Sequence, residues 1–187
     1  MIRAISSIAL AVAALCAHAA DWDVAALFGT LARERPGRAV FHEKKYISLL
    51  DRPVESSGEL AFTPPDRLEK RTLKPRPERV LVDRDRVTLE RGGKSMSMGL
   101  RENPAVAVLV ESIRGTLAGD LQSLTRTYSV ALDGTEARWR LVLRPLDPAA
   151  ATLVERVEIA GSEGRVATVE IFQADGDRSV MTLTPAP

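Results

Sequence analysis

Short β-strand patterns, each ended by turn residues, follow one another from residue 38 almost to the C-terminus and leave few folds open to this chain. Proline fixes φ and removes a backbone donor, so the prolines between these patterns suit turns and not sheet interiors. Strand patterns that recur every 8–12 residues or so are typical of an antiparallel meander. The expected strands are residues 38–49, 56–63, 67–74, 78–83, 86–91, 94–100, 122–132, 136–144, 152–160, 165–173 and 177–184.

The connections between these strands carry their own turn signals. Asp133-Gly134 and Asp175-Gly176 are the clearest predictions of tight hairpins, because glycine tolerates positive φ. Residues 160–164 predict a longer hairpin loop, and residues 144–148 predict the longest irregular connection.

A first helix is expected over residues 21–35, before the strands begin. Asp21 or Asp23 can cap it, since a carboxylate there accepts the orphan N–H groups and complements the helix dipole. Pro36-Gly37 is expected to end it. Apolar residues recur at helical spacing and predict one stripe that packs on the sheet: Val24, Leu27, Phe28 and Leu31.

A second helix is predicted at residues 103–117, where Asn103-Pro104 supplies an N-cap residue and a proline at the first helical position. A helix that is apolar most of the way round is normally buried on more than one side. Because this helix interrupts a run of strands, we expect it to plug or cover the sheet. Its main stripe is Val106, Leu109, Val110, Ile113 and Leu117.

The N-terminus, residues 1–19, is typical of a signal peptide. Arg3 supplies the positive region, an apolar stretch of about 11 residues follows, and Ala17-His18-Ala19 offers the small-x-small cleavage pattern, so cleavage is expected near Ala19. The apolar stretch is too short to span a membrane, which takes about 20 residues. These features predict export to the periplasm.

Cys16, the one cysteine, raises the alternative of a lipid-modified N-terminus. Such a site prefers leucine three residues before the cysteine and a small residue just before it, where this chain has Ala13 and Leu15. We therefore expect Cys16 to leave with the leader, and residues 20–187 to form one cysteine-free domain. Without Arg3, that domain has 25 basic and 25 acidic residues, which argues against nucleic acid or an anionic membrane as its principal partner.

Alternation along the strands gives the sheet one oily and one wet side. Periodicity alone predicts an ordinary filled core for the oily side. The one unusual element there is Ser95-Met96-Ser97-Met98, because methionines suit surfaces that accommodate varied apolar shapes and also fill gaps in cores.

One pattern is more specific: Gly58-x-Leu60-x-Phe62-x-x-Pro65-Asp66-x-Leu68, with a helix before it and the strand 78–83 after it. This order of elements resembles the LolA-type periplasmic lipoprotein carriers. The resemblance implies a mainly β (α+β) fold, an open antiparallel β-barrel of about 11 strands with two helices covering its concave face. Element order extends the resemblance over almost all of residues 20–187.

The resemblance also implies a function. LolA-type carriers hold the acyl chains of lipoproteins on the concave face, between an inner-membrane donor transporter and an outer-membrane acceptor. For this chain it implies a monomeric carrier of lipoprotein acyl chains or another lipid, with the helix at 103–117 as a movable wall. The residues expected to bind lipid are Leu60, Phe62, Leu68, Met96, Met98, Leu109, Val110, Ile113, Tyr128 and Trp139.

The chain departs from the family at the proline turn. Dedicated carriers have an arginine just before the proline that latches the lid loops, and here that position is Pro64. The departure favours a specialised route, such as one for a glycolipid or a lipid-linked pigment.

Catalytic signals are missing from the sequence. His42 is the one histidine outside the leader, and the chain has no HExxH, no Gly-rich phosphate loop and no GxSxG motif. We expect no catalytic residue, no metal site and no cofactor, and therefore no enzyme. The competing interpretation is a sensor or assembly-factor module whose half-barrel binds a protein or peptide, which a filled concave face would favour.

Overall fold

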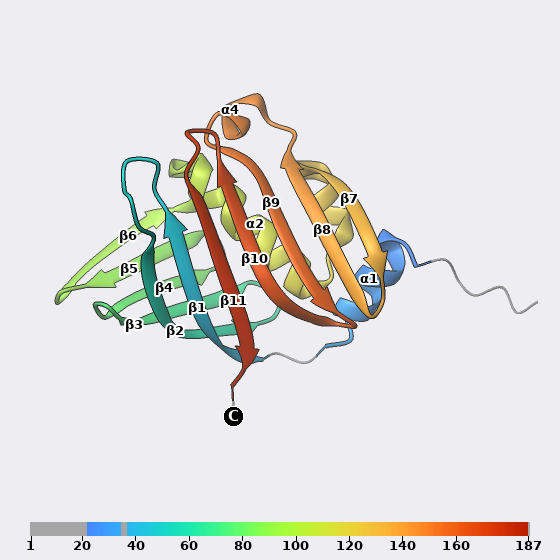
Figure 1. Ribbon diagram of the computed structural model, residues 1–187, viewed down its shortest axis with the longest axis horizontal. Coiled ribbons are helices and arrows are strands. Elements are labelled where there is room, and N and C mark those ends of the chain that lie inside the picture. The colour runs from blue at the N-terminus through green and yellow to red at the C-terminus, as the bar shows by residue number, and fades with distance from the viewer. Residues whose placement is uncertain (1–21, 35–36, 187) are drawn as a thin grey trace, which may run out of the picture.

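The computed structural model describes residues 22–34 and 37–186 (Figure 1). The expected leader at residues 1–19, Cys16, Asp21 and Pro36 lie outside the described residues.

Eleven strands form one antiparallel sheet in the order β6-β5-β4-β3-β2-β1-β11-β10-β9-β8-β7. Among the described strands, the β1–β11 contact alone joins strands that are distant in sequence, so the predicted meander is confirmed, with β6 and β7 at its two edges. The strands are β1 (Arg38–Tyr46), β2 (Val54–Thr63), β3 (Arg67–Lys74), β4 (Glu78–Asp83), β5 (Arg86–Arg91), β6 (Lys94–Gly99), β7 (Tyr128–Thr135), β8 (Arg138–Pro145), β9 (Val154–Ser162), β10 (Arg165–Gln173) and β11 (Arg178–Pro185).

Four helices lie within residues 22–34 and 37–186, where two were predicted. Two of them are the predicted ones, α1 (Val24–Leu31), capped by Asp23, and α2 (Pro104–Ala118), capped by Asn103. The additional helices are α3 (Leu121–Thr127) and α4 (Pro148–Ala151), and a 3-10 turn, η1 (Leu100–Glu102), precedes α2.

The strand predicted from residue 122 was wrong at its start, because residues 121–127 form α3. Gly119 ends α2 with φ of 67°, and Asp120 then caps α3 by accepting a hydrogen bond from the Ser123 N–H at 2.9 Å. An αL glycine followed by a capping carboxylate is the local signal for a second helix.

Two of the predicted turns also moved. Gly134 lies inside β7 at φ 101°, and the turn is Glu136-Ala137. Gly161 lies inside β9, where an added Cβ would be 2.6 Å from Cζ2 of Trp139. Both glycines therefore lie where neighbouring atoms leave no room for a side chain. The turn predicted at Asp175-Gly176 is confirmed between β10 and β11.

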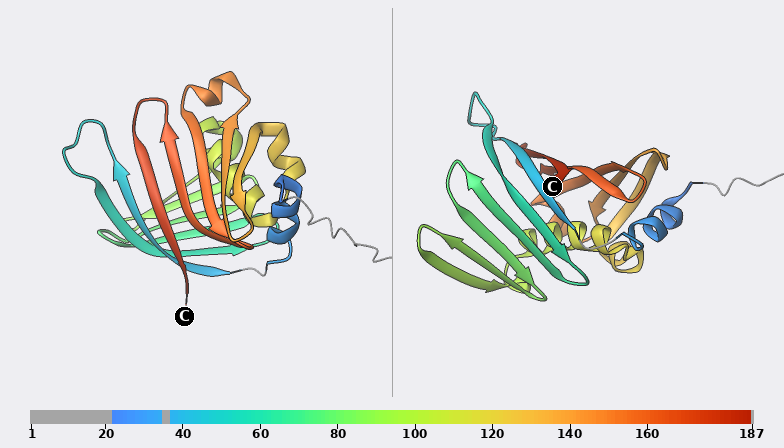
Figure 2. Two further views of the ribbon diagram at one scale, coloured as in Figure 1. Left: turned by 45° about the vertical axis from the view of Figure 1, so that its right-hand side comes forward. Right: turned by 90° about the horizontal axis from the view of Figure 1, so that it is seen from below.

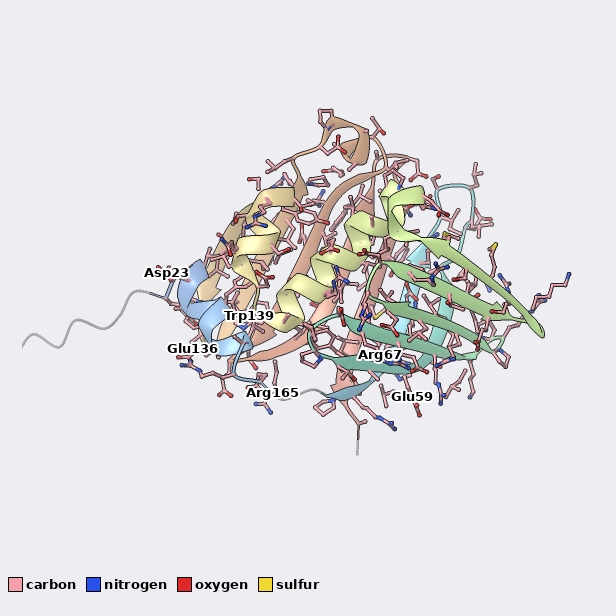
Figure 3. The ribbon with its side chains drawn as sticks, turned by 180° about the vertical axis from the view of Figure 1, so that it is seen from behind. Asp23, Glu59, Arg67, Glu136, Trp139 and Arg165 are labelled. Atoms are coloured by element: carbon pink, nitrogen blue, oxygen red, sulfur yellow. The ribbon has the colours of Figure 1, made fainter. Side chains whose placement is uncertain are left out.

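The sheet curls around α2, which lies diagonally across the concave side (Figures 2 and 3). Pairs of charged and aromatic side chains from neighbouring strands lie on the convex side. On it the Arg79 side chain bonds Glu69 at 2.8 Å, and the Arg156 guanidinium stacks 3.5 Å from the centre of the Phe172 ring. The predicted division into an oily and a wet side is confirmed.

Two apolar clusters fill the concave side. The larger is built from α1, α2, α3, α4 and strands β1 and β7–β11, around fully buried Phe41, Trp139 and Leu141. The smaller is formed by Phe62, Leu68, Val82, Val87, Leu100 and Val110. We call these the large and the small cluster. No helix among the described residues has the length and apolar character needed to cross a membrane.

Candidate functional site

Helix α2 is the element that the two clusters share. Leu109 packs against the large cluster and Val110 is a member of the small one, while Ile113 packs against both. The helix therefore stands between the two halves of the curled sheet and fills the space that an open half-barrel would leave free (Figure 3).

The buried polar groups of α2 are satisfied within the helix itself. The Ser112 hydroxyl donates to the Leu109 carbonyl at 2.8 Å, and the Thr116 hydroxyl donates to the Ser112 carbonyl at 2.7 Å. Both residues are fully buried. A buried hydroxyl without a partner costs about 1–3 kcal/mol. Because both hydroxyls bond carbonyls of α2 itself, the helix can pack on the sheet or leave it without breaking these hydrogen bonds.

Two side-chain hydrogen bonds tie α2 to the strands and turns within the described part of the chain. The buried Tyr128 hydroxyl donates to the Val108 carbonyl, and the Arg114 guanidinium donates to the Arg84 carbonyl at 3.0 Å. Burial raises the pKa of Tyr128, so the phenol stays a neutral donor at physiological pH. One tie goes to each half of the sheet, and apolar side chains of α2 pack against both clusters.

The structure places the ten expected lipid-binding residues at different depths. Phe62, Leu68 and Val110 are buried members of the small cluster, with Met98 and Ile113 half-buried against it. Tyr128 and Trp139 are fully buried in the large cluster, against which Leu60 and Leu109 pack. Met96 is 55% exposed. Most of the set therefore forms the contact between α2 and the sheet, and its role in lipid binding stays a prediction.

A second row of residues on the concave side is less covered. Cross-strand pairing aligns one residue from each strand of β2–β6 in this row, namely Leu60, Lys70, Val80, Leu89 and Met96. We call it the open row. Next to it, the row Phe62, Leu68, Val82, Val87 and Met98 lies beneath α2. Figure 3 shows strands β3–β6 continuing past the helix.

Lys70, the one charged residue in the open row, pairs with Glu43 of β1. Its Nζ lies 2.5 Å from Glu43 Oε2 and 4.8 Å from the centre of the Phe41 ring. The same carboxylate accepts hydrogen bonds from Ser179 at 2.6 Å and from Ser56 at 3.2 Å. Burial acts to raise the pKa of Glu43, but the Lys70 charge and these hydrogen bonds outweigh it, so the pKa lies below its ordinary value.

We expect Glu43→Gln to destabilise the protein in a pH-dependent way. A carboxyl whose pKa is lowered by folding contributes stability above its unfolded pKa of about 4.3, and that contribution is lost as pH falls through the folded value. Urea denaturation should therefore show a loss of about 1–3 kcal/mol at pH 7 that shrinks as the pH falls below the unfolded value. A constant difference across this range would contradict the prediction.

Two hollows of the described surface lie at turns of the sheet. One, of about 400 Å³, is open and is bordered by Arg38, Thr63, Arg67 and Glu69 beside Phe62. The other, of about 660 Å³, surrounds the β4–β5 turn with Asp83, Arg84, Asp85 and Arg86. Both are bordered by charged side chains, with Phe62 as an apolar neighbour in the first and Leu81 in the second.

Pro64 is exposed at the β2–β3 turn. Arg67 faces the convex side instead and pairs with Asp83 at 3.4 Å. The tie from Arg114 to the β4–β5 turn was not foreseen, because nothing in the local sequence connects residues 84 and 114. The Glu43–Lys70 pair was also missed, although alternation does place Lys70 on the face of Leu68.

Within residues 22–34 and 37–186, no three histidine, cysteine, aspartate or glutamate side chains gather closely enough to hold a metal ion. Several ion pairs join neighbouring strands on the convex side, such as Arg140 with Glu158 at 3.1 Å. The main feature that the described residues offer is therefore the apolar face on the concave side.

Comparison with known proteins gives one family match. The family model described as outer membrane lipoprotein carrier protein LolA-like matches residues 16–186. A search of curated proteins finds no significant match.

Several solved structures have a similar chain course at low identity. A LolA superfamily protein from Nitrosomonas europaea has 9% identity and a TM-score of 0.44, with 84% of this chain and 90% of that chain covered. A putative outer membrane lipoprotein-sorting protein domain from Vibrio parahaemolyticus has 10% identity and a TM-score of 0.45, with 86% and 88% covered. The MucA/MucB complex of Pseudomonas aeruginosa has 15% identity and a TM-score of 0.46, with 89% and 59% covered.

Proposed function

Because this chain belongs to the LolA-like family of outer membrane lipoprotein carrier proteins, we propose that it is a periplasmic carrier that sequesters the acyl chains of a lipoprotein or another lipid. It takes its cargo from an inner-membrane donor, delivers it to an outer-membrane acceptor and catalyses no reaction. Residues 1–19 act as the export signal, and residues 20–187 act as a single, monomeric half-barrel domain.

The observation that carries this proposal is the way α2 occupies the concave side. Apolar side chains of α2 pack against both clusters, and the two ties from Tyr128 and Arg114 add side-chain hydrogen bonds to the sheet and its turns. An acyl chain can therefore take the place of α2 on the sheet while replacing one apolar surface by another. Few polar groups need new partners, because the hydroxyls of Ser112 and Thr116 are bonded within the helix.

The energies of this exchange suit a carrier. A buried CH₂ group is worth about 0.8 kcal/mol, so a chain of about 16 carbons gains roughly 12 kcal/mol on leaving water. Displacing α2 exposes apolar surface of its own and offsets much of that gain. The affinity for lipid is then the difference between the free energy gained by burying the acyl chain and the free energy lost by exposing α2. Such a difference gives an affinity that is strong enough to extract a lipid and weak enough to release it.

Native mass spectrometry of the protein purified from a periplasmic extract, with lipid extraction alongside, tests the proposal. We expect a bound acyl species, and we expect a fluorescent fatty acid to bind the delipidated protein and to be displaced by that species. An unliganded mass together with no binding of the fluorescent probe would contradict the carrier function.

A second candidate function is favoured by the same filled concave side. In this alternative α2 stays in place, and the half-barrel binds a protein or peptide as a sensor or assembly factor. Strand β6 is an exposed sheet edge with serine and methionine side chains, and an extended peptide can add to such an edge. This alternative would be supported if a defined periplasmic protein co-purified with this chain and no lipid were bound.

A further inference from the structure

The open row contains one residue that does not belong to an apolar surface. Lys70 stands between Leu60 and Val80 in the cross-strand register, and the row continues through Leu89 to Met96. A lysine in such a row must have its charge compensated, and Glu43 provides the compensation at 2.5 Å. An ion pair is a costly way to complete an apolar face, since apolar residues of similar volume often serve stability equally well.

The hydrogen-bonding capacity of the pair is unevenly used. Glu43 accepts from Lys70, Ser179 and Ser56, which nearly fills a carboxylate. Lys70 has three N–H donors, of which one bonds Glu43 and the charge is further stabilised by the Phe41 ring. The Lys70 side chain is 27% exposed, so it has donor capacity to spare and access to a ligand on the open row.

The negative charge of Glu43 determines which hydrogen-bond acceptor of a ligand can bind Lys70. A second carboxylate at Lys70 would lie within a few ångströms of Glu43 and would be repelled by it. A neutral carbonyl oxygen accepts a hydrogen bond from an ammonium without this penalty. A hydrocarbon without an acceptor would leave the spare donor facing an apolar ligand, at the cost of desolvating it.

We propose that Lys70, held by Glu43, donates a hydrogen bond to the ester carbonyl of an acyl chain lying on the open row, so that the protein selects esterified chains over free fatty acids and ethers. This inference rests on the proposed carrier function and names the chemical class of its cargo. The same ester occurs in the diacylglyceryl group of a lipoprotein and in a free glycerolipid.

Three matched amphiphiles test the proposal by isothermal titration below their micelle concentrations. These are 1-monolauroylglycerol, which has an ester carbonyl, 1-O-dodecylglycerol, which has an ether in its place, and laurate. We expect the wild-type protein to bind the ester about tenfold more tightly than the ether, as one charge-assisted hydrogen bond allows. Laurate should bind less tightly than the ester, and a diacylated lipopeptide tested beside dilauroylglycerol distinguishes the two sources of the ester.

Variants locate the preference. Lys70→Met should bind ester and ether equally, and Lys70→Arg should retain the preference. The double variant Glu43→Gln/Lys70→Met guards against unfolding from an unpaired carboxylate and should also lose the preference. Lys44→Met is the matched control, because Lys44 pairs with Glu55 at 3.3 Å on the exposed convex side.

The outcomes separate the two proposals. If the wild-type protein binds none of the three amphiphiles, the carrier function fails and this inference fails with it. If the wild-type protein binds ester and ether equally, or if Lys70→Met retains the preference, the role of Lys70 is overturned while the carrier function stands.

Discussion

Replacing Trp139 with alanine is expected to lower the free energy of unfolding by about 3–5 kcal/mol, the usual cost of truncating a fully buried large aromatic side chain. Trp139 is 1% exposed and lies in the large cluster. Its indole N–H donates to the Glu163 carbonyl at 2.8 Å, and its ring packs so closely on Gly161 that no Cβ fits there. The alanine variant loses the packing and the hydrogen bond and leaves a cavity.

Urea denaturation of the Trp139→Ala and Trp139→Phe variants measures this loss. Phenylalanine retains most of the apolar volume and loses the donor, so its cost should be clearly smaller. Met96→Ala is the matched control, because Met96 lies on the same concave face but is 55% exposed, and it should change stability by less than about 1 kcal/mol. Equal stability losses at Trp139 and Met96 would mean that the large cluster is not the main source of stability.

Alternation along β8 puts Trp139, Leu141 and Leu143 on one face, and all three are buried. Alternation does not distinguish a residue that touches cargo from one that is sealed in a core. Trp139 and Tyr128 were expected to bind lipid, and the structure places both beneath the helices of the large cluster.

Some strand boundaries were predictable because proline and glycine turns interrupt the pattern there. The strands β3, β4 and β5 have the predicted bounds. Helix α3 was missed because residues 121–127 mix polar and apolar residues without a clear period, and its formation depends on Asp120 and on packing of Leu124 against Gly115. Packing in the folded chain therefore makes residues 121–127 helical, although their local propensity does not favour a helix clearly.

The features that control the site were beyond the reach of local patterns. The contact between Arg114 and the Arg84 carbonyl joins residues 30 positions apart, and the Ser179–Glu43 hydrogen bond spans 136 positions. Such contacts depend on the β1–β11 pairing and on the path of α2 across the sheet, which only the folded chain defines.

Holding α2 against the sheet is expected to abolish acyl binding, and this is the second large effect. Because the mature chain is expected to contain no cysteine, Arg84→Cys/Arg114→Cys provides two unique thiols at the outer tie, where the native Arg114 side chain reaches the Arg84 carbonyl at 3.0 Å. A short, reducible bis-methanethiosulfonate reagent can bridge them. If cargo takes the place of α2, the bridged protein should bind a fluorescent fatty acid at least about tenfold more weakly than the same protein after reduction.

A bridge within the sheet controls for the chemistry. Thr88 and Ser97 are cross-strand partners on the convex side, with hydroxyls 3.3 Å apart, so the bridged Thr88→Cys/Ser97→Cys variant carries the same reagent without restraining α2. It should bind the probe like the wild-type protein. Undiminished binding in the bridged Arg84→Cys/Arg114→Cys variant would contradict displacement of α2. The acyl chain would then have to lie on the open row beside a stationary helix, where Lys70 and Met96 are accessible without any movement of α2.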